Sequence, residues 1–129
     1  MADHDEQRAQ AIKALLGAFN ALRIVLQSLP IPVEIPSFFG TDGRPSPEGV
    51  LALDRARAIL ADEPIAENVR NAHDSAILDW FTTYELMFLT AMAGPAPWRM
   101  DAAEYSLARL ATILEMITTD DLDDWDDKS

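Results

Sequence analysis

The chain has 129 residues, of which 49% are hydrophobic, and this combination suits one folded domain and argues against global disorder. It contains no cysteine, which excludes disulfides, thiolate metal sites and a cysteine nucleophile. Twenty-two acidic against ten basic residues leave a formal net charge of −12. Such a charge repels nucleic acid and anionic lipid and favours a basic protein as partner, although it can also serve only to keep a protein soluble. The acidic, polar N-terminus differs from a secretory signal, so we expect a cytoplasmic protein.

Apolar residues recur at steps of three and four from about Asp5 to Leu29, which predicts an amphipathic helix. Pro30 and Pro32 end it, because proline lacks an amide donor and restricts the residue before it. The predicted core face of this helix consists of Ile12, Leu15, Leu16, Phe19, Leu22, Leu26 and Leu29.

The segment 30–47 contains five prolines and two glycines, which predicts an irregular connection. Its apolar residues, among them Val33 and Ile35, are too many for a solvated linker. We therefore expect an extended strap across the bundle, with Phe38 and Phe39 inserted into a groove. The alternative is that these two rings form an exposed docking site.

Ser46, Pro47 and Glu48 match the cap, first position and first turn of a second helix, which ends at Asp62-Glu63-Pro64. Its apolar face consists of Val50, Leu53, Ala56, Ile59 and Leu60.

A third helix is predicted from near Ile65 to Met92 or Ala93, and its second half is apolar on most sides. A narrow polar stripe consists of Ser75, Asp79, Thr82, Thr83, Glu85 and Thr90. A helix that is apolar nearly all round needs several neighbours or a second copy of the protein. A homodimer through this helix is therefore one interpretation. The residues expected at that oligomer interface are Trp80, Phe81, Tyr84, Met87 and Phe88.

Asp101 and Glu104 resemble a capping box and predict the start of a fourth helix. Trp98, just before it, is expected to pack across the ends of the third and fourth helices, or alternatively to be presented to a partner. The core face of the fourth helix consists of Ala103, Leu107, Leu110, Leu114 and Ile117. The pattern predicts an all-α, four-helix bundle-like domain over residues 1–119, with a proline-rich strap between the first two helices and a flexible acidic C-terminal tail over 120–129.

The tail holds six aspartates and one lysine, so it carries −5 of the formal −12. Leu122 and Trp125 would share one face of an induced helix, between carboxylates, and such a pair suits a basic groove with an apolar floor. The residues predicted to bind a partner are Asp120, Asp121, Leu122, Asp123, Asp124, Trp125, Asp126 and Asp127. The alternative is that Trp125 folds back onto the protein's own helices and the aspartates only solubilise the chain.

No familiar catalytic pattern occurs in the sequence. His73 has no second histidine or glutamate at a four-residue step, so we expect a satisfied or solvated surface histidine. Asp79 and Glu85 point about 240° apart on a helix, so we expect two acids along a solvent-facing stripe instead of a catalytic pair. Serine elbows and phosphate-binding glycine loops are also missing. The sequence therefore predicts a protein that is not an enzyme and uses no metal or cofactor.

The sequence favours an acidic protein-binding module, such as an inhibitor, an immunity-type protein or an assembly chaperone, that occupies a basic surface of a partner. Two alternatives stay open. One is a nucleic-acid mimic that inhibits a DNA- or RNA-binding protein, which Glu63, Glu67 and Asp74 support because they fall near one face of the third helix. The other is a homo-oligomeric structural or assembly protein.

Overall fold

The computed structural model describes residues 2–94 and 96–119 and contains four helices. They are α1 (Ala2–Gln27), α2 (Pro47–Leu60), α3 (Glu67–Ala93) and α4 (Pro97–Thr118). The described residues form no strand, only an isolated bridge between Phe39 and Pro45. The predicted all-α, four-helix bundle-like fold is confirmed. The predicted partner-binding tail, 120–127, lies outside the described residues and stays a prediction.

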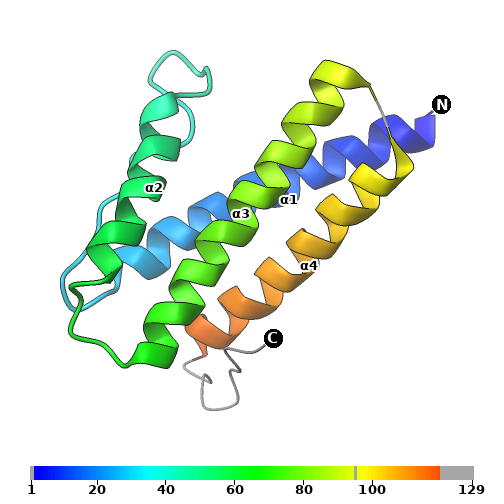
Figure 1. Ribbon diagram of the computed structural model, residues 1–129. Helices are drawn as coiled ribbons and strands as arrows, with labels where there is room; N and C mark the ends of the chain where they lie inside the picture. Colours follow the sequence, from blue (N-terminus) through cyan, green and yellow to red (C-terminus); the bar gives the residue numbers. More distant parts are fainter. Residues whose placement is uncertain (1, 95, 120–129) are drawn as a thin grey trace.

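The four helices are arranged around α3. Figure 1 shows α3 and α4 side by side as an antiparallel pair, with α1 crossing behind them and α2 on the other side of α3. Of the four helices, only α3 contacts each of the other three extensively. The third helix thus has several neighbours, which is one of the two arrangements that its sequence indicated.

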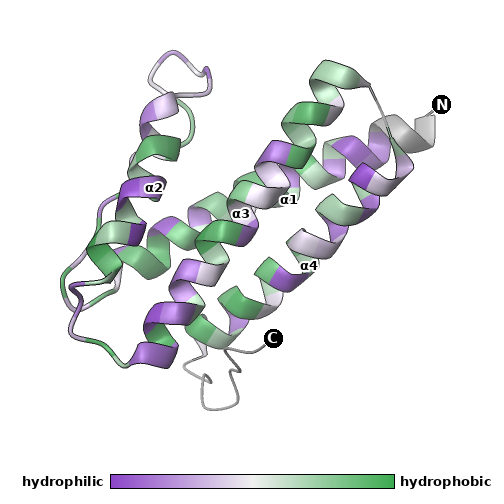
Figure 2. Ribbon diagram, in the orientation of Figure 1, coloured by the Kyte–Doolittle hydropathy of each residue, from purple (hydrophilic) through white to green (hydrophobic). Residues whose placement is uncertain are grey.

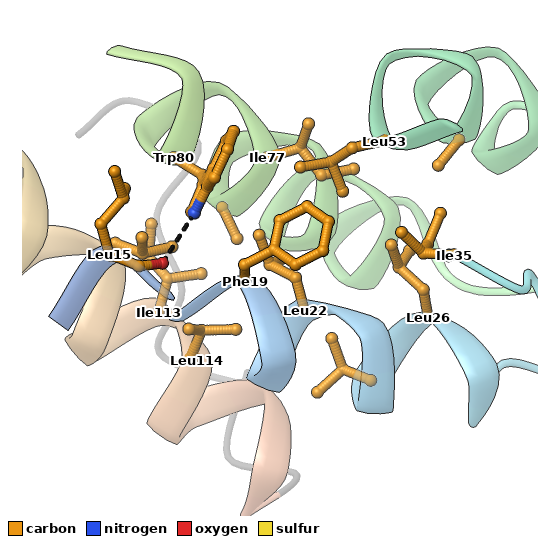
Figure 3. Packing of buried hydrophobic residues seen from close by; sticks show 14 of the residues in the cluster. Leu15, Phe19, Leu22, Leu26, Ile35, Leu53, Ile77, Trp80, Ile113 and Leu114 are labelled. Carbon is orange, nitrogen blue, oxygen red and sulfur yellow. Dashed lines mark hydrogen bonds between the residues drawn. The ribbon is translucent and has the colours of Figure 1, made fainter. Parts of the chain in front are cut away.

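Aromatic rings from α1, the strap and α3 meet at the centre of the core. The indole of Trp80 is fully buried, and its Nε1 donates a hydrogen bond to the carbonyl oxygen of Leu15 at 2.9 Å (Figure 3). The Trp80 ring lies 5.2 Å from Phe19 and stacks on Tyr84 at 5.1 Å, between ring centroids. Phe38 of the strap meets Phe19 edge-on at 5.5 Å. These contacts join α1, α3 and the strap in one network.

Part of the polar stripe of α3 is buried, whereas Thr82 and Glu85 face solvent as the sequence indicated. Asp79 forms an ion pair with Arg109 of α4 at 3.2 Å, and Thr83 and Thr90, one and three turns further along, are buried. Each threonine hydroxyl donates to the carbonyl four residues earlier, at 2.9 Å. The hydroxyl is thus satisfied inside its own helix, which leaves a small side chain that packs against a neighbour.

The segment between α1 and α2 is a strap laid across the bundle, as predicted. Val33 and Ile35 are buried, and Arg23 of α1 holds the strap by donating to the carbonyl oxygen of Ile35 at 2.8 Å. Only one of the two phenylalanines is inserted as expected. Phe38 is partly buried against the core, whereas Phe39 is exposed.

The predicted start of α2 is confirmed and that of α4 is wrong. Ser46 caps α2, and its hydroxyl accepts from the backbone N–H of Glu48 at 3.3 Å. The helix α4 begins at Pro97, so Asp101 lies inside it and does not cap it. Proline suits the first helical position, where the missing N–H costs nothing, and this start competes successfully with the later one.

The earlier start of α4 also changes the role of Trp98. It lies on the first turn of α4, is 63% exposed, and has the guanidinium of Arg99 at 5.1 Å from its ring centroid. The expectation that it packs across the helix ends is therefore wrong.

The helix α1 combines length with a strongly apolar face. Among the described residues, Glu6–Gln27 is the one segment that could cross a membrane by length and composition alone. Core helices pass the same test, and here Leu15, Leu22 and Leu26 are buried in the bundle. Ile12, also predicted for the core, is exposed.

We expect Trp80→Phe to lower the free energy of unfolding by about 2 kcal/mol, because it removes a buried hydrogen bond and leaves a void. Urea denaturation measures this change. Trp98→Phe is the matched control, and its effect should stay within about 0.5 kcal/mol because that ring is exposed. Equal effects of the two substitutions would contradict the central role of Trp80.

Substitution by alanine at Gly49 and at Gly17 should change the stability of the fold in opposite directions. A Cβ on Gly49 would lie 3.0 Å from Phe19 Cζ and 3.1 Å from the Pro36 carbonyl oxygen, so Gly49→Ala should destabilise the fold by about 1–3 kcal/mol. A Cβ on Gly17, inside α1, meets nothing within 4 Å, so Gly17→Ala should stabilise it by about 0.5–1 kcal/mol. Thermal and urea unfolding of both variants check these signs.

Candidate protein-binding surface

An open apolar groove lies between α1, the strap and the C-terminal half of α3. Its volume is about 300 Å³. Its walls are formed by α1, the strap and α3. The residues that line it are Ile12, Leu15, Leu16, Phe38, Phe39, Pro45, Tyr84, Met87 and Phe88. We call this feature the α1–α3 groove.

The groove exists because α2 is too short to cover α3. The helix α2 has 14 residues and α3 has 27. The two helices are joined where Arg57 of α2 pairs with Asp74 at 2.8 Å and where Arg70 of α3 donates to the Leu60 carbonyl oxygen at 3.0 Å. From there they diverge toward the C-terminal end of α3 (Figure 1). Among the described residues, no helix therefore covers the C-terminal half of α3 on the side that α2 covers in the first half.

The side chains on this uncovered part are large and apolar. Phe88 is 53% exposed and Met92, one turn further, is 73% exposed. Figure 2 shows mainly hydrophobic colours at the C-terminal end of α3. Phe39 on the strap and Ile12 on α1 are also exposed, on the other walls of the groove. A cluster of exposed apolar side chains is typical of surfaces that bind another molecule, which makes this groove the candidate surface.

Only part of the predicted oligomer interface on α3 lies at the surface of this structure, and the interface itself stays a prediction. Trp80 and Met87 are buried, and the Trp80 indole is bonded within the core, so it offers no surface to a second molecule. Phe81 and Tyr84 are partly buried against the same core. Of the five predicted residues, Phe88 is the one that is exposed.

His73 is a buried residue, and its predicted surface position is wrong. Its Nδ1 lies 2.8 Å from the carbonyl oxygen of Val69, so the ring is satisfied within α3. Burial lowers the pKa of His73 because it disfavours the charged imidazolium, and the Val69 carbonyl and Glu63 act weakly in the opposite direction. The ring borders a second pocket of about 330 Å³ that Ile65 and Ile117 also line.

Asp79 and Glu85 do not form a pair, as predicted, but only Glu85 is exposed. The Asp79 side chain is 14% exposed beside Arg109 of α4. Its partial burial raises the pKa of Asp79, and the charge of Arg109 opposes that shift.

The row of acids expected for nucleic-acid mimicry does not form on the surface. Glu63 is buried, and its carboxylate accepts a hydrogen bond from the backbone N–H of Ile31 at 3.1 Å. Asp74 is paired with Arg57. Only Glu67 of the three predicted acids is exposed without such a role in the fold. In the part of the chain that the structure describes, no three acidic or histidine side chains gather to hold a metal ion.

We expect the free energy of unfolding to fall as the pH drops from about 7.5 to about 5.5. The unfolded chain binds a proton near the ordinary histidine pKa of 6.5, whereas the folded chain binds it only at lower pH, so acid favours unfolding. Urea denaturation of the wild type and of His73→Gln at both pH values measures the effect. The free energy of unfolding should depend less on pH in the variant than in the wild type. An equal pH dependence in the two proteins would contradict this role of His73. Asp79, whose raised pKa acts in the opposite direction, contributes equally to both proteins.

The groove and the buried polar residues thus differ in what they can do. Glu63 and His73 are buried with hydrogen-bond partners in the fold, and Asp74, which is partly exposed, is paired with Arg57. The α1–α3 groove instead presents apolar side chains to solvent, where an apolar part of another molecule can cover them. Comparison with family models, curated proteins and solved structures finds no match to this chain.

Proposed function

We propose that this protein is a non-enzymatic, acidic binding domain that attaches to a basic partner protein through the α1–α3 groove. The observation that carries the proposal is the exposed apolar lining of that groove, with Phe39 and Phe88 at its open side. Apolar area that leaves water contributes about 25 cal/mol per Å², and buried aromatic anchors supply most of the affinity in protein interfaces.

The charge of the chain supports a basic partner. A formal charge of −12 attracts a positively charged protein over a distance of about 8 Å at physiological salt. Charge of this kind mainly raises the rate of association, while the apolar groove supplies affinity. The acidic residues from Asp120 to Asp127 follow α4 in the sequence and add to this attraction, which makes them the second contact in the proposal.

A homo-oligomer is the competing function, and the exposure of Phe88 and Met92 favours it as well. Two copies, however, each carry −12 and repel one another, whereas a basic partner is attracted. A nucleic-acid mimic is less well supported, because Glu63 is buried and the charge of Asp74 is paired with Arg57. A cytoplasmic location is part of the proposal, and the buried apolar face of α1 is compatible with it.

Affinity capture from the native host tests the proposed function. We expect the wild type to capture a basic protein that Phe88→Ser no longer retains, because the groove loses its exposed anchor. Ile24→Ser is the matched control, since Ile24 is 65% exposed on α1 and does not line the groove. A chain truncated after Thr119 should capture the same protein more weakly, and the difference should vanish at high salt. Equal capture by Phe88→Ser and Ile24→Ser would refute the proposal.

A further inference from the structure

We infer that the α1–α3 groove takes an amphipathic helix with a basic outer face, laid along the C-terminal half of α3. The inference rests on the proposed function and names the kind of partner segment involved. It depends on the chemistry of the groove lining, on the spacing of the residues in its walls and on the charge of the chain.

The apolar lining of the groove favours a helical partner segment over an extended one. Apart from the hydroxyl of Tyr84, the side chains in the groove are apolar. An extended peptide laid there would leave the backbone N–H and C=O groups that face the apolar lining without partners, which costs free energy for each group. A helix satisfies these groups within itself and presents only side chains.

The strap offers little opportunity for strand pairing. Its short hairpin already uses the N–H groups of Gly40 and Ser46, which donate to the carbonyl oxygens of Arg44 and Phe38 at 2.8 and 2.7 Å. Pro45, which lines the groove, has no N–H. A partner strand would therefore find few donors at this edge.

The walls of the groove have helical spacing. Tyr84 and Phe88 lie four residues apart on α3, and Ile12 and Leu16 lie four residues apart on α1. Rows of residues at this spacing form the ridges that pack into the grooves of another helix. The helix α2 already packs on the N-terminal half of the same side of α3, so a partner helix would extend that layer.

The charge of this protein favours basic residues on the outer face of the partner helix. Within three residues of a lining residue in the sequence, the exposed bases are Lys13 and Arg44, and the exposed acids are Asp42, Glu48 and Glu85. Acids therefore outnumber bases there by one. The net charge of −12 then sets the preference, and it favours lysine or arginine on the side of the partner helix that faces away from the groove. A second copy of this chain would bring the same negative charge.

Three synthetic peptides of roughly 18 residues test the inference with the full-length protein. The first places leucine at helical spacing among lysines. The second has the same composition but alternates leucine and lysine, so that a helix has no apolar face. The third replaces lysine by glutamate in the first. Titration calorimetry at about 0.15 M salt gives the affinities, and circular dichroism gives the helix formed on binding.

We expect the first peptide to bind at least about tenfold more tightly than either of the others and to gain helix. Phe88→Ser and Ile12→Ser, on opposite walls, should each weaken it by about tenfold, whereas Ile24→Ser should leave it unchanged. Thermal unfolding shows that each variant is folded, and two independent walls keep the test valid if one variant is not. The affinity of the chain truncated after Thr119 for the first peptide should still depend on Phe88.

Equal binding of the first two peptides, or no effect of either groove variant, would mean attraction by charge alone and would overturn the inference. A wild-type dimer in sedimentation that Phe88→Ser converts to a monomer would show a second copy in the groove and would also overturn it. If the peptides fail while cellular capture still depends on Phe88, the inference is wrong and the proposed function stands. If neither depends on Phe88, both are wrong.

Discussion

The hydrogen bond from the Trp80 indole to the carbonyl oxygen of Leu15 determines how α1 and α3 are aligned. It joins the middle of one helix to the middle of the other, and Phe19 and Tyr84 pack against the same ring. Because both helices are rigid, this contact also sets what lies about one turn away on α1 and about two turns away on α3. On that side Ile12 stands opposite Phe88, across the α1–α3 groove. The core contact and the candidate binding surface are thus parts of one arrangement.

Burial in this protein does not follow residue polarity alone. Several polar side chains are buried and satisfied, among them Thr83 within α3 and Glu63 against the strap. Several large apolar side chains, such as Phe88 and Met92, remain in water. The buried polar groups hold elements together at little cost because each has a partner. The exposed parts of the apolar side chains are available to another molecule, whereas the buried polar groups are already engaged within the fold.

Local signals in the sequence were sufficient for most of the fold. Proline at 30 and 47 and the cap at Ser46 mark boundaries that depend only on neighbouring residues, and the structure confirms them. The start of α4 was missed because two local signals compete, Pro97 and the Asp101 pattern, and both are compatible with a helix. The burial of His73 and Thr90 was missed because a polar residue type favours solvent on average, while its actual surroundings depend on segments far away in the chain.

The sequence by itself determined the helical class, the strap and the acidic charge, since periodicity, proline chemistry and ionisable residues act locally or simply add up. Only the tertiary structure decided which apolar face stays open. Periodicity identifies a face of α3 as apolar, but it does not say which neighbour covers that face. The length and direction of α2 determine this, because α2 contacts the first half of α3 and diverges from the second half. Phe88 is exposed for that reason, whereas Trp80 of the same helix is buried against Phe19 of α1 and Phe38 of the strap.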